Sequence, residues 1–125
     1  TSEAAQRLLN EAARYLGTPY VWGGYSPSGF DCSGFVSYCL THSGVRNTGR
    51  LTAQGLYDIC TPVSQSEAQP GDLIFFTGTY DAGVPVTHIG IYVGNGQMIH
   101  CGHPVQYTSI NSPYWQSHFY GFGRW

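Results

Sequence analysis

Cys32 lies in the stretch Gly29–Phe35, GFDCSGF, between an acidic residue and an apolar run. Asp31 is a residue type favoured at a helix N-cap, so Cys32 is expected at the first helical position. Free N–H groups and the helix dipole at such a position favour a thiolate, and the same groups can hold the oxyanion formed when sulfur attacks a carbonyl. Cys32 is therefore a candidate nucleophile, with a buried structural thiol as the alternative.

A nucleophilic cysteine needs a base and a group that orients the base, and His88 and His100 are the candidates. The two histidines flank a hairpin loop, so the pairing register decides whether they share a face of the sheet. A two-residue loop at Asn95–Gly96 would separate them. A three-residue loop, Gly94–Gly96, with its last glycine in the left-handed bulge position would instead pair Gly90 with His100. His88 then becomes a diagonal neighbour of His100 on the same face.

The three-residue register also separates polar from apolar side chains. One face carries both histidines together with Gly90, whereas the other is almost entirely apolar. We therefore predict the three-residue loop, in which Val93 pairs with Gln97. The apolar face then reads Ile89, Ile91, Val93, Gln97, Ile99 and Cys101.

Helices and strands must position these residues. Apolar spacings of three and four predict a helix that begins at Ser2–Glu3 and stops at Gly17. A second helix is expected from Cys32 to Ser43–Gly44, and a short one over Thr52–Ile59. Helices followed by antiparallel strands predict an α+β domain. Strands are expected at 72–76, 87–93, 97–101, 105–108 and 119–123.

The composition describes one globular domain and excludes several classes of partner. The chain has 125 residues, 10% charged residues and a net charge of −2, so it offers no basic surface for nucleic acid or an anionic membrane. No run approaches the roughly 18 apolar residues of a membrane span. The chain begins at Thr1 without a secretion signal, so we expect a processed secreted protein or a domain excised from a longer one.

The other cysteines indicate neither a disulfide scaffold nor a metal site. Four cysteines at irregular spacing, without a CxxC pair, fit neither pattern. Cys39 is expected in the core. Cys60 is expected either in the core or bridged to Cys39, with free thiols favoured, and Cys101 is expected to be buried. A metal site built from His100, Cys101 and His103 is disfavoured, because alternate residues of a strand face opposite ways. A domain that works through a cysteine and two histidines would need no metal or organic cofactor, so we expect none.

Five short motifs follow one another along the chain, between Tyr15 and about Cys101. They read GxPYxWGG at 17–24, DCSGF at 31–35, PGDLxFF at 70–76, HxGIYxG at 88–94 and MIH at 98–100. Each motif alone is weak, but the ordered set is specific. With this set the chain resembles the NlpC-type cysteine peptidases of bacterial cell walls.

The resemblance implies a papain-like fold and hydrolysis of peptidoglycan stem peptides, usually at the bond between γ-D-glutamate and a diamino acid. It makes Cys32 the nucleophile, His88 the base, and His100 the residue that orients the His88 ring. It also implies a secreted or wall-associated domain, expected to be a monomer, whose partner is the stem peptide.

The resemblance further places Tyr20, Asp31 and Ser33 in the substrate cleft. In many relatives the residue at the Asp31 position anchors a free amino group of the stem, which appears once the sugar has been removed. The chain departs from the family pattern at 101–103 and in a long insertion at 79–85. Both departures lie near the expected cleft and bear on substrate preference.

We expect Cys32 to rest largely as a thiolate beside protonated His88, with the oxyanion held by the Cys32 N–H and by Tyr20. Two other functions remain open. The same cysteine and histidine would serve an amidase or an acyl-transfer enzyme, because the pair specifies acyl transfer and not the acceptor. A non-catalytic wall-binding module would keep the fold without the reaction.

Overall fold

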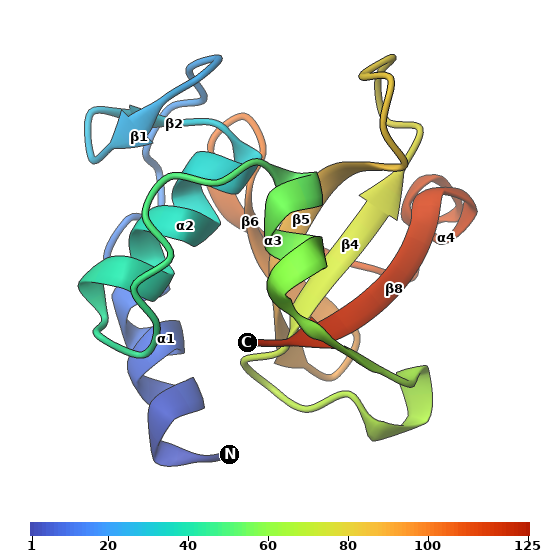
Figure 1. Ribbon diagram of the computed structural model, residues 1–125, viewed down its shortest axis with the longest axis horizontal. Helices are drawn as coiled ribbons and strands as arrows, with labels where there is room; N and C mark the ends of the chain where they lie inside the picture. The colour runs from blue at the N-terminus through green and yellow to red at the C-terminus, as the bar shows by residue number, and fades with distance from the viewer.

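In the computed structural model, which describes residues 1–125, the three longest helices lie in the first half of the chain and most strands of the main sheet in the second half (Figure 1). The predicted α+β class is therefore confirmed, and the five expected strands correspond to β4–β8. The elements are α1 (Glu3–Ala13), β1 (Tyr25–Ser26), β2 (Gly29–Phe30), α2 (Cys32–His42), α3 (Ala53–Ile59), β3 (Thr61–Val63), the 3-10 helix η1 (Gln65–Glu67), β4 (Leu73–Thr77), β5 (Val86–Gly94), β6 (Gln97–Cys101), β7 (Val105–Ser109), α4 (Pro113–His118) and β8 (Phe119–Arg124).

The first three helices begin at side chains that cap them. Ser2, Asp31 and Thr52 accept hydrogen bonds from the backbone N–H groups three residues further on, at 3.1, 2.7 and 3.0 Å. Such a cap satisfies one of the N–H groups that the first turn leaves free. The helix starts predicted from these residues are therefore confirmed, including the place of Cys32 at the start of α2.

The main sheet is antiparallel and has the strand order β3-β8-β4-β5-β6-β7. Helices α1, α2 and α3 pack on one of its faces, and α4 packs on the other (Figure 1). β5 lies inside the sheet, between β4 and β6, and α2 and α3 both contact it. The start of α2 is thereby held against β5.

Strand alternation divides the core between the two faces of the sheet. In β4, Leu73 and Phe75 join the cluster under the three helices, whereas Ile74 and Phe76 join a smaller cluster on the opposite face, next to Trp115 of α4. The first cluster also contains Leu8, Phe30, Cys32, Phe35, Val36, Cys39, Leu40, Leu56, Ile89, Ile91, Ile99 and Cys101, among others.

The hairpin between β5 and β6 has the predicted register but not the predicted loop. Gly94 pairs with Gln97, so the loop is the two-residue turn Asn95–Gly96, and both of its residues have positive φ, 54° and 73°. Val93 and Gly94 together face Gln97, which is a β-bulge with Gly94 at φ 94°. The bulge restores the pairing expected from a three-residue loop, because beyond it Ile91 pairs with Ile99. The histidines therefore share a face.

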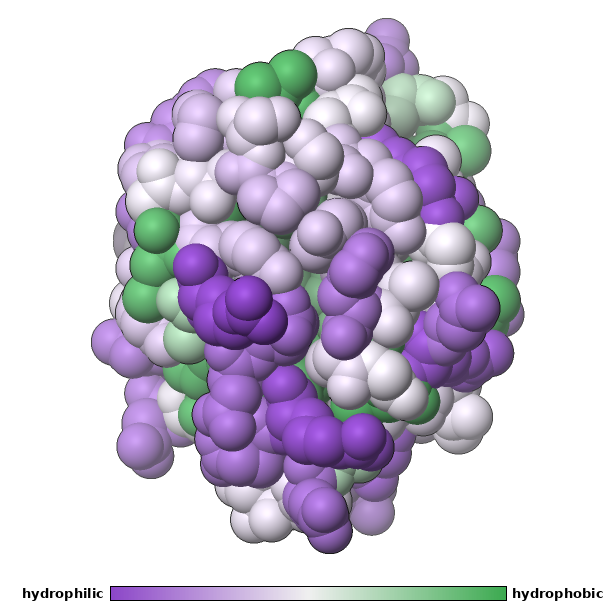
Figure 2. Space-filling model, turned by 90° about the vertical axis from the view of Figure 1, so that its left-hand side faces the viewer, coloured by the Kyte–Doolittle hydropathy of each residue, from purple (hydrophilic) through white to green (hydrophobic).

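Several short elements were not expected from the sequence. The β1–β2 hairpin, β3, η1 and α4 all lie in stretches without a clear apolar period. Figure 2 views the side of α1 and α2 and shows hydrophilic residues gathered over its lower half, with only scattered hydrophobic ones. None of the helices is long and apolar enough to cross a membrane.

Candidate active site

Cys32 is buried between the start of α2 and β5, with 8% of the residue exposed. Its thiol donates to the carbonyl oxygen of Thr87 at 3.9 Å. The backbone N–H groups of Ile89 and Ser33 act on the same sulfur and lower the pKa of Cys32. The sulfur therefore lies against the backbone of the two residues that flank His88 in β5.

Gly34, in the first turn of α2, allows the aromatic loop before the helix to pack closely. A Cβ at this position would clash with the carbonyl oxygen of Gly24. The same carbonyl accepts a hydrogen bond from the backbone N–H of Asp31 at 3.1 Å. The loop that carries Tyr20 is thus tied to the helix start that carries Cys32.

The two histidines are joined by a hydrogen bond, and their rings lie against Trp115 of α4. Nε2 of His88 lies 2.9 Å from Nδ1 of His100, and Nε2 of His100 lies 2.8 Å from the hydroxyl of Thr108. No hydrogen bond occupies Nδ1 of His88, and none joins this ring to the thiol of Cys32. Since no buried side-chain nitrogen or oxygen lacks a partner, Nδ1 of His88 reaches solvent.

Aromatic side chains enclose the two hydrogen-bonded histidines. The indole of Trp115 stacks on His88 with ring centroids 5.1 Å apart, and its centroid lies 5.4 Å from that of His100. Phe76 packs on Trp115 at 4.6 Å and on His88 at 5.9 Å. Sequence reasoning missed Thr108 and Trp115, because their relation to the histidines is set by pairing of β6 with β7 and by packing of α4.

Burial favours the neutral forms of Cys32 and of both histidines. Burial raises the pKa of Cys32 to about 11, and the neighbouring Asp31 carboxylate adds to the shift. Burial also lowers the pKa of His88 to about 3, with a further contribution from His100, and lowers the pKa of His100 to about 4. Burial thus opposes the expected thiolate beside a protonated His88, because desolvation disfavours the charged form of each group.

A cleft of about 570 Å³ opens beside Cys32 and gathers the three predicted cleft residues, Tyr20, Asp31 and Ser33. Burial, followed by the neighbouring Cys32, raises the pKa of Tyr20 to about 12, so its hydroxyl stays protonated and can donate. The cleft reaches Thr87 but is not lined by His88. Its other lining residues are Trp22, Gly23, Arg50, Thr52, Ala53, Gln54, Gly55, Asp58, Tyr80, Ala82, Val84 and Val86.

Arg50 is a cleft residue that sequence reasoning missed. Its Nη2 forms an ion pair with Asp31 at 2.7 Å, and its Nη1 donates to the hydroxyl of Ser33 at 3.0 Å. The two predicted substrate-binding residues thus share one arginine. No local pattern signals this, because Arg50 follows Asp31 by 19 residues in an irregular segment.

Of the two departures from the family pattern, the insertion lines the cleft and the segment 101–103 contacts one cleft residue. The insertion brings Tyr80, Ala82 and Val84 into its lining. The His103 ring packs on Tyr20 with centroids 4.6 Å apart. Cys101 is buried, as predicted, and its thiol donates to the carbonyl of Phe30 at 3.2 Å.

The remaining cysteines and acids form no further centre. All four cysteines are free thiols, as favoured from the sequence, and Cys39 is fully buried in the core. The structure contains no cluster of three or more His, Cys, Asp or Glu side chains that could hold a metal ion.

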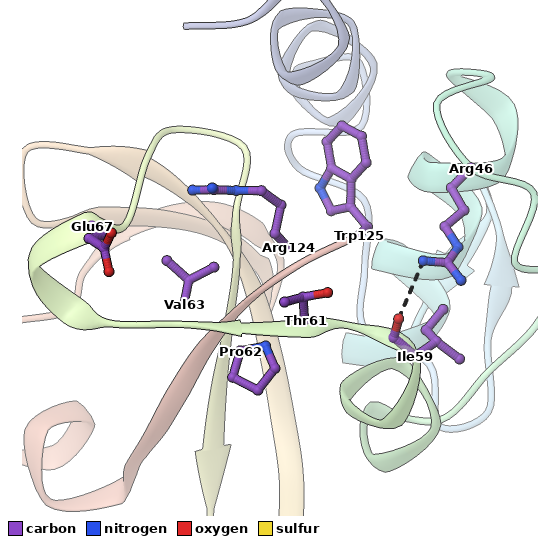
Figure 3. Close-up of a pocket in the computed structure, with 8 residues that line it drawn as sticks. All are labelled: Arg46, Ile59, Thr61, Pro62, Val63, Glu67, Arg124 and Trp125. Carbon is purple, nitrogen blue, oxygen red and sulfur yellow. Dashed lines mark hydrogen bonds between the residues drawn. The ribbon is translucent and has the colours of Figure 1, made fainter.

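A second cavity, of about 540 Å³, lies elsewhere on the molecule and shares no residue with the cleft (Figure 3). Its lining includes neither cysteine nor histidine. Arg46 donates to the carbonyl of Ile59 at 3.4 Å, and Arg124 is paired with Asp72 at 2.7 Å. It therefore offers no nucleophile, and its two arginines already have partners.

The chain has a papain-like fold. A helix that begins at a cysteine packs on an antiparallel sheet, and this sheet carries the hydrogen-bonded histidines. Residues 17–124 match the model of the NlpC/P60 family. The chain therefore belongs to the NlpC/P60 family, as the ordered motifs predicted.

Known proteins similar to the chain agree with this assignment. It is 44% identical over 121 residues to the bifunctional muramidase/DL-endopeptidase CwlT of Bacillus subtilis, covering 95% of this chain and 36% of that protein. It is 48% identical over 118 residues to the probable endopeptidase p60 of Listeria seeligeri, covering 94% and 21%. A crystal structure of a lipoprotein-like NLP/P60 protein from Staphylococcus aureus has a TM-score of 0.92 at 43% identity, covering 99% of this chain and 42% of that one.

Proposed function

We propose that this chain is the catalytic domain of a cell-wall hydrolase, a cysteine endopeptidase that cleaves peptidoglycan stem peptides. One observation carries the proposal: hydrogen bonds connect Thr108 to His100 and His100 to His88, and the Cys32 thiol lies against the backbone next to His88. The two curated relatives described above are named endopeptidases, and the chain spans only 36% and 21% of their lengths. Because the substrate lies in the wall, we infer that the domain acts outside the cytoplasm.

The neutral resting state makes His88 a general base. The Cys32 sulfur attacks the peptide carbonyl while its proton moves to Nδ1 of His88, and the carbonyl oxygen becomes an oxyanion. Backbone N–H groups at the start of α2 and the Tyr20 hydroxyl are the donors available to hold it. The intermediate collapses to a thioester as the amine leaves with the proton from His88. Water then gives a proton to His88 and attacks the thioester, which releases the acid and restores the thiol.

His100 and Thr108 hold His88 in the tautomer that this reaction requires. When Nε2 of His88 carries its proton, it donates to Nδ1 of His100, and Nε2–H of His100 donates to Thr108. Nδ1 of His88 is then left with a lone pair and can accept the thiol proton. The protonated ring that forms keeps the same hydrogen bond to His100.

We infer that the scissile bond joins γ-D-glutamate to a diamino acid, either diaminopimelate or lysine. The Bacillus subtilis relative is named a DL-endopeptidase, and the bond from D-glutamate to the L-centre of a diamino acid is of that kind. A bond elsewhere in the wall would make the domain an amidase or another acyl-transfer enzyme with the same mechanism.

Defined muropeptides of both diamino acid types test the proposal, with products identified by mass spectrometry. Cleavage at the proposed bond leaves a new amino end on the diamino acid, whereas an amidase would release the intact stem. Cys32→Ala should abolish all turnover. Activity that survived Cys32→Ala would refute the mechanism, and binding without turnover by the unaltered chain would indicate the non-catalytic wall-binding module.

A further inference from the structure

Asp31 lines the cleft, and hydrogen bonds from the protein already occupy all the acceptor positions of its carboxylate. Oδ1 accepts from the Gly34 N–H at 2.7 Å and from the Ser33 hydroxyl at 3.3 Å. Oδ2 accepts from the Gly23 N–H at 3.1 Å and from Nη2 of Arg50 at 2.7 Å. A carboxylate has about four lone-pair sites. This occupancy argues against the expectation that Asp31 anchors a free amino group of the substrate.

Arg50 is held in place by more than its ion pair with Asp31. Nη1 donates to the Ser33 hydroxyl at 3.0 Å and to the carbonyl of Leu51 at 3.1 Å, and the guanidinium lies 6.0 Å from the ring centroid of Tyr25. The side chains of Arg50 and Asp31 are 32% and 14% exposed. Charged hydrogen bonds strengthen as water is withdrawn, so Arg50 stays where it neutralises Asp31.

We propose that Arg50 makes the cleft select stem peptides whose amino end is acylated, as in stems still attached to the sugar, over stems with a free ammonium. The inference rests on the proposed function, because it takes the stem peptide as the substrate. A free ammonium would either displace Arg50 from Asp31 or lie beside its positive charge, and both weaken binding. An acylated amino end has no charge and presents a carbonyl oxygen instead.

Arg50 also retains donors for such a carbonyl. A guanidinium has five N–H groups, and three of those of Arg50 are used, on Asp31, Ser33 and Leu51. The other two belong to a side chain that lines the cleft beside Cys32. The arginine that excludes an ammonium is thus equipped to bind the acyl oxygen that replaces it.

Calorimetry on the Cys32→Ala chain tests the selection without cleavage of the ligand. The ligand is one tetrapeptide stem in three forms: with a free amino end, N-acetylated, and attached to N-acetylmuramic acid. Both acylated forms should bind roughly tenfold or more tighter than the free form, the scale of one charged hydrogen bond. With Arg50→Gln added, the three affinities should fall within about threefold of one another, because the repelling charge and the donors are gone.

Two further variants separate charge from packing. Arg50→Lys keeps the positive charge and should keep the preference for acylated stems. Arg46→Gln makes the same change in the cavity of Figure 3 and should leave the preference intact. Thermal melting checks that each variant is folded. If Arg50→Gln does not fold, the order of the three ligand affinities on the chain that keeps Arg50 decides whether the inference holds.

Equal or tighter binding of the free-amine stem to the Arg50-containing chain would overturn the inference. So would an unchanged preference in folded Arg50→Gln. The proposed function fails differently: a chain with Cys32 intact that prefers acylated stems but hydrolyses none of the three would refute the endopeptidase and leave the selection by Arg50 standing.

Discussion

Nε2 of His88 and Nδ1 of His100 lie 2.9 Å apart because the two residues are diagonal neighbours on adjacent antiparallel strands. Gly90 leaves space beside them, since a Cβ there would lie 3.2 Å from that of His100. The same diagonal relation connects His100 to Thr108 on β7, where Met98 is the direct partner of Thr108. Two diagonal steps therefore carry the hydrogen-bonded chain across three strands.

His100→Ala should slow turnover without removing the base. The His88 ring loses the acceptor that fixes its Nε2–H, so we expect kcat to fall about 10²-fold with KM little changed. His88→Ala removes the proposed base and should be far less active than His100→Ala. Steady-state release of new amino ends from a stem peptide measures both variants, and the reverse order of activities would contradict the assigned roles.

Thr108 should act through His100, as a positioning residue. Thr108→Val removes the oxygen that lies 2.8 Å from Nε2 of His100, and loss of one such bond predicts a fall in kcat of about 2- to 10-fold. Thr108→Ser keeps the oxygen and should keep kcat close to that of the unaltered chain. Equal losses in the two variants would show that Thr108 contributes only packing.

Local signals were sufficient to predict the helix starts and the place of Cys32. Ser2, Asp31 and Thr52 cap their helices through residues three positions away, so the sequence alone contains the interaction. The register that brings His88 and His100 together was also predictable, because only that register leaves one face of the hairpin apolar.

Features that depend on distant contacts were not predictable. The predicted three-residue loop was wrong because Gly94, at φ 94°, takes a bulge position. The apolar pattern does not distinguish such a bulge from a longer loop. Arg50 and Trp115 reach the site from an irregular segment and from α4, so no periodic pattern marks them. The expectation of a thiolate at Cys32 took account of the helix N-terminus but not of burial, which raises the pKa of Cys32 to about 11.

The half-buried His88 and the buried His100 should make the fold sensitive to acid. Unfolded histidines have a pKa near 6.5, whereas burial lowers the pKa of folded His88 to about 3 and of His100 to about 4. Between these values the unfolded chain binds protons that the folded chain does not, so stability falls as the pH falls below about 6.5. We expect each histidine to cost about 2 kcal/mol at pH 5.

Melting temperatures between pH 7 and pH 5 test this dependence. His100→Asn removes one titrating group, so its curve should be flatter than that of the unaltered chain whatever its absolute stability. Ile110→Val loses packing in the smaller core cluster without removing a titrating group and should give a lower but parallel curve. A His100→Asn curve parallel to the unaltered one would show that this histidine is not held neutral.

Alkylation of Cys32 should report a thiol that stays protonated at neutral pH. Because burial and Asp31 raise its pKa to about 11, the rate of its reaction with iodoacetamide should keep rising through pH 9. In denaturant the same residue should titrate near the free-cysteine value of about 8.5. Peptide mapping by mass spectrometry must assign the label, since all four cysteines are free. A rate plateau between pH 5 and pH 8 in the folded chain would instead reveal a resting thiolate paired with protonated His88.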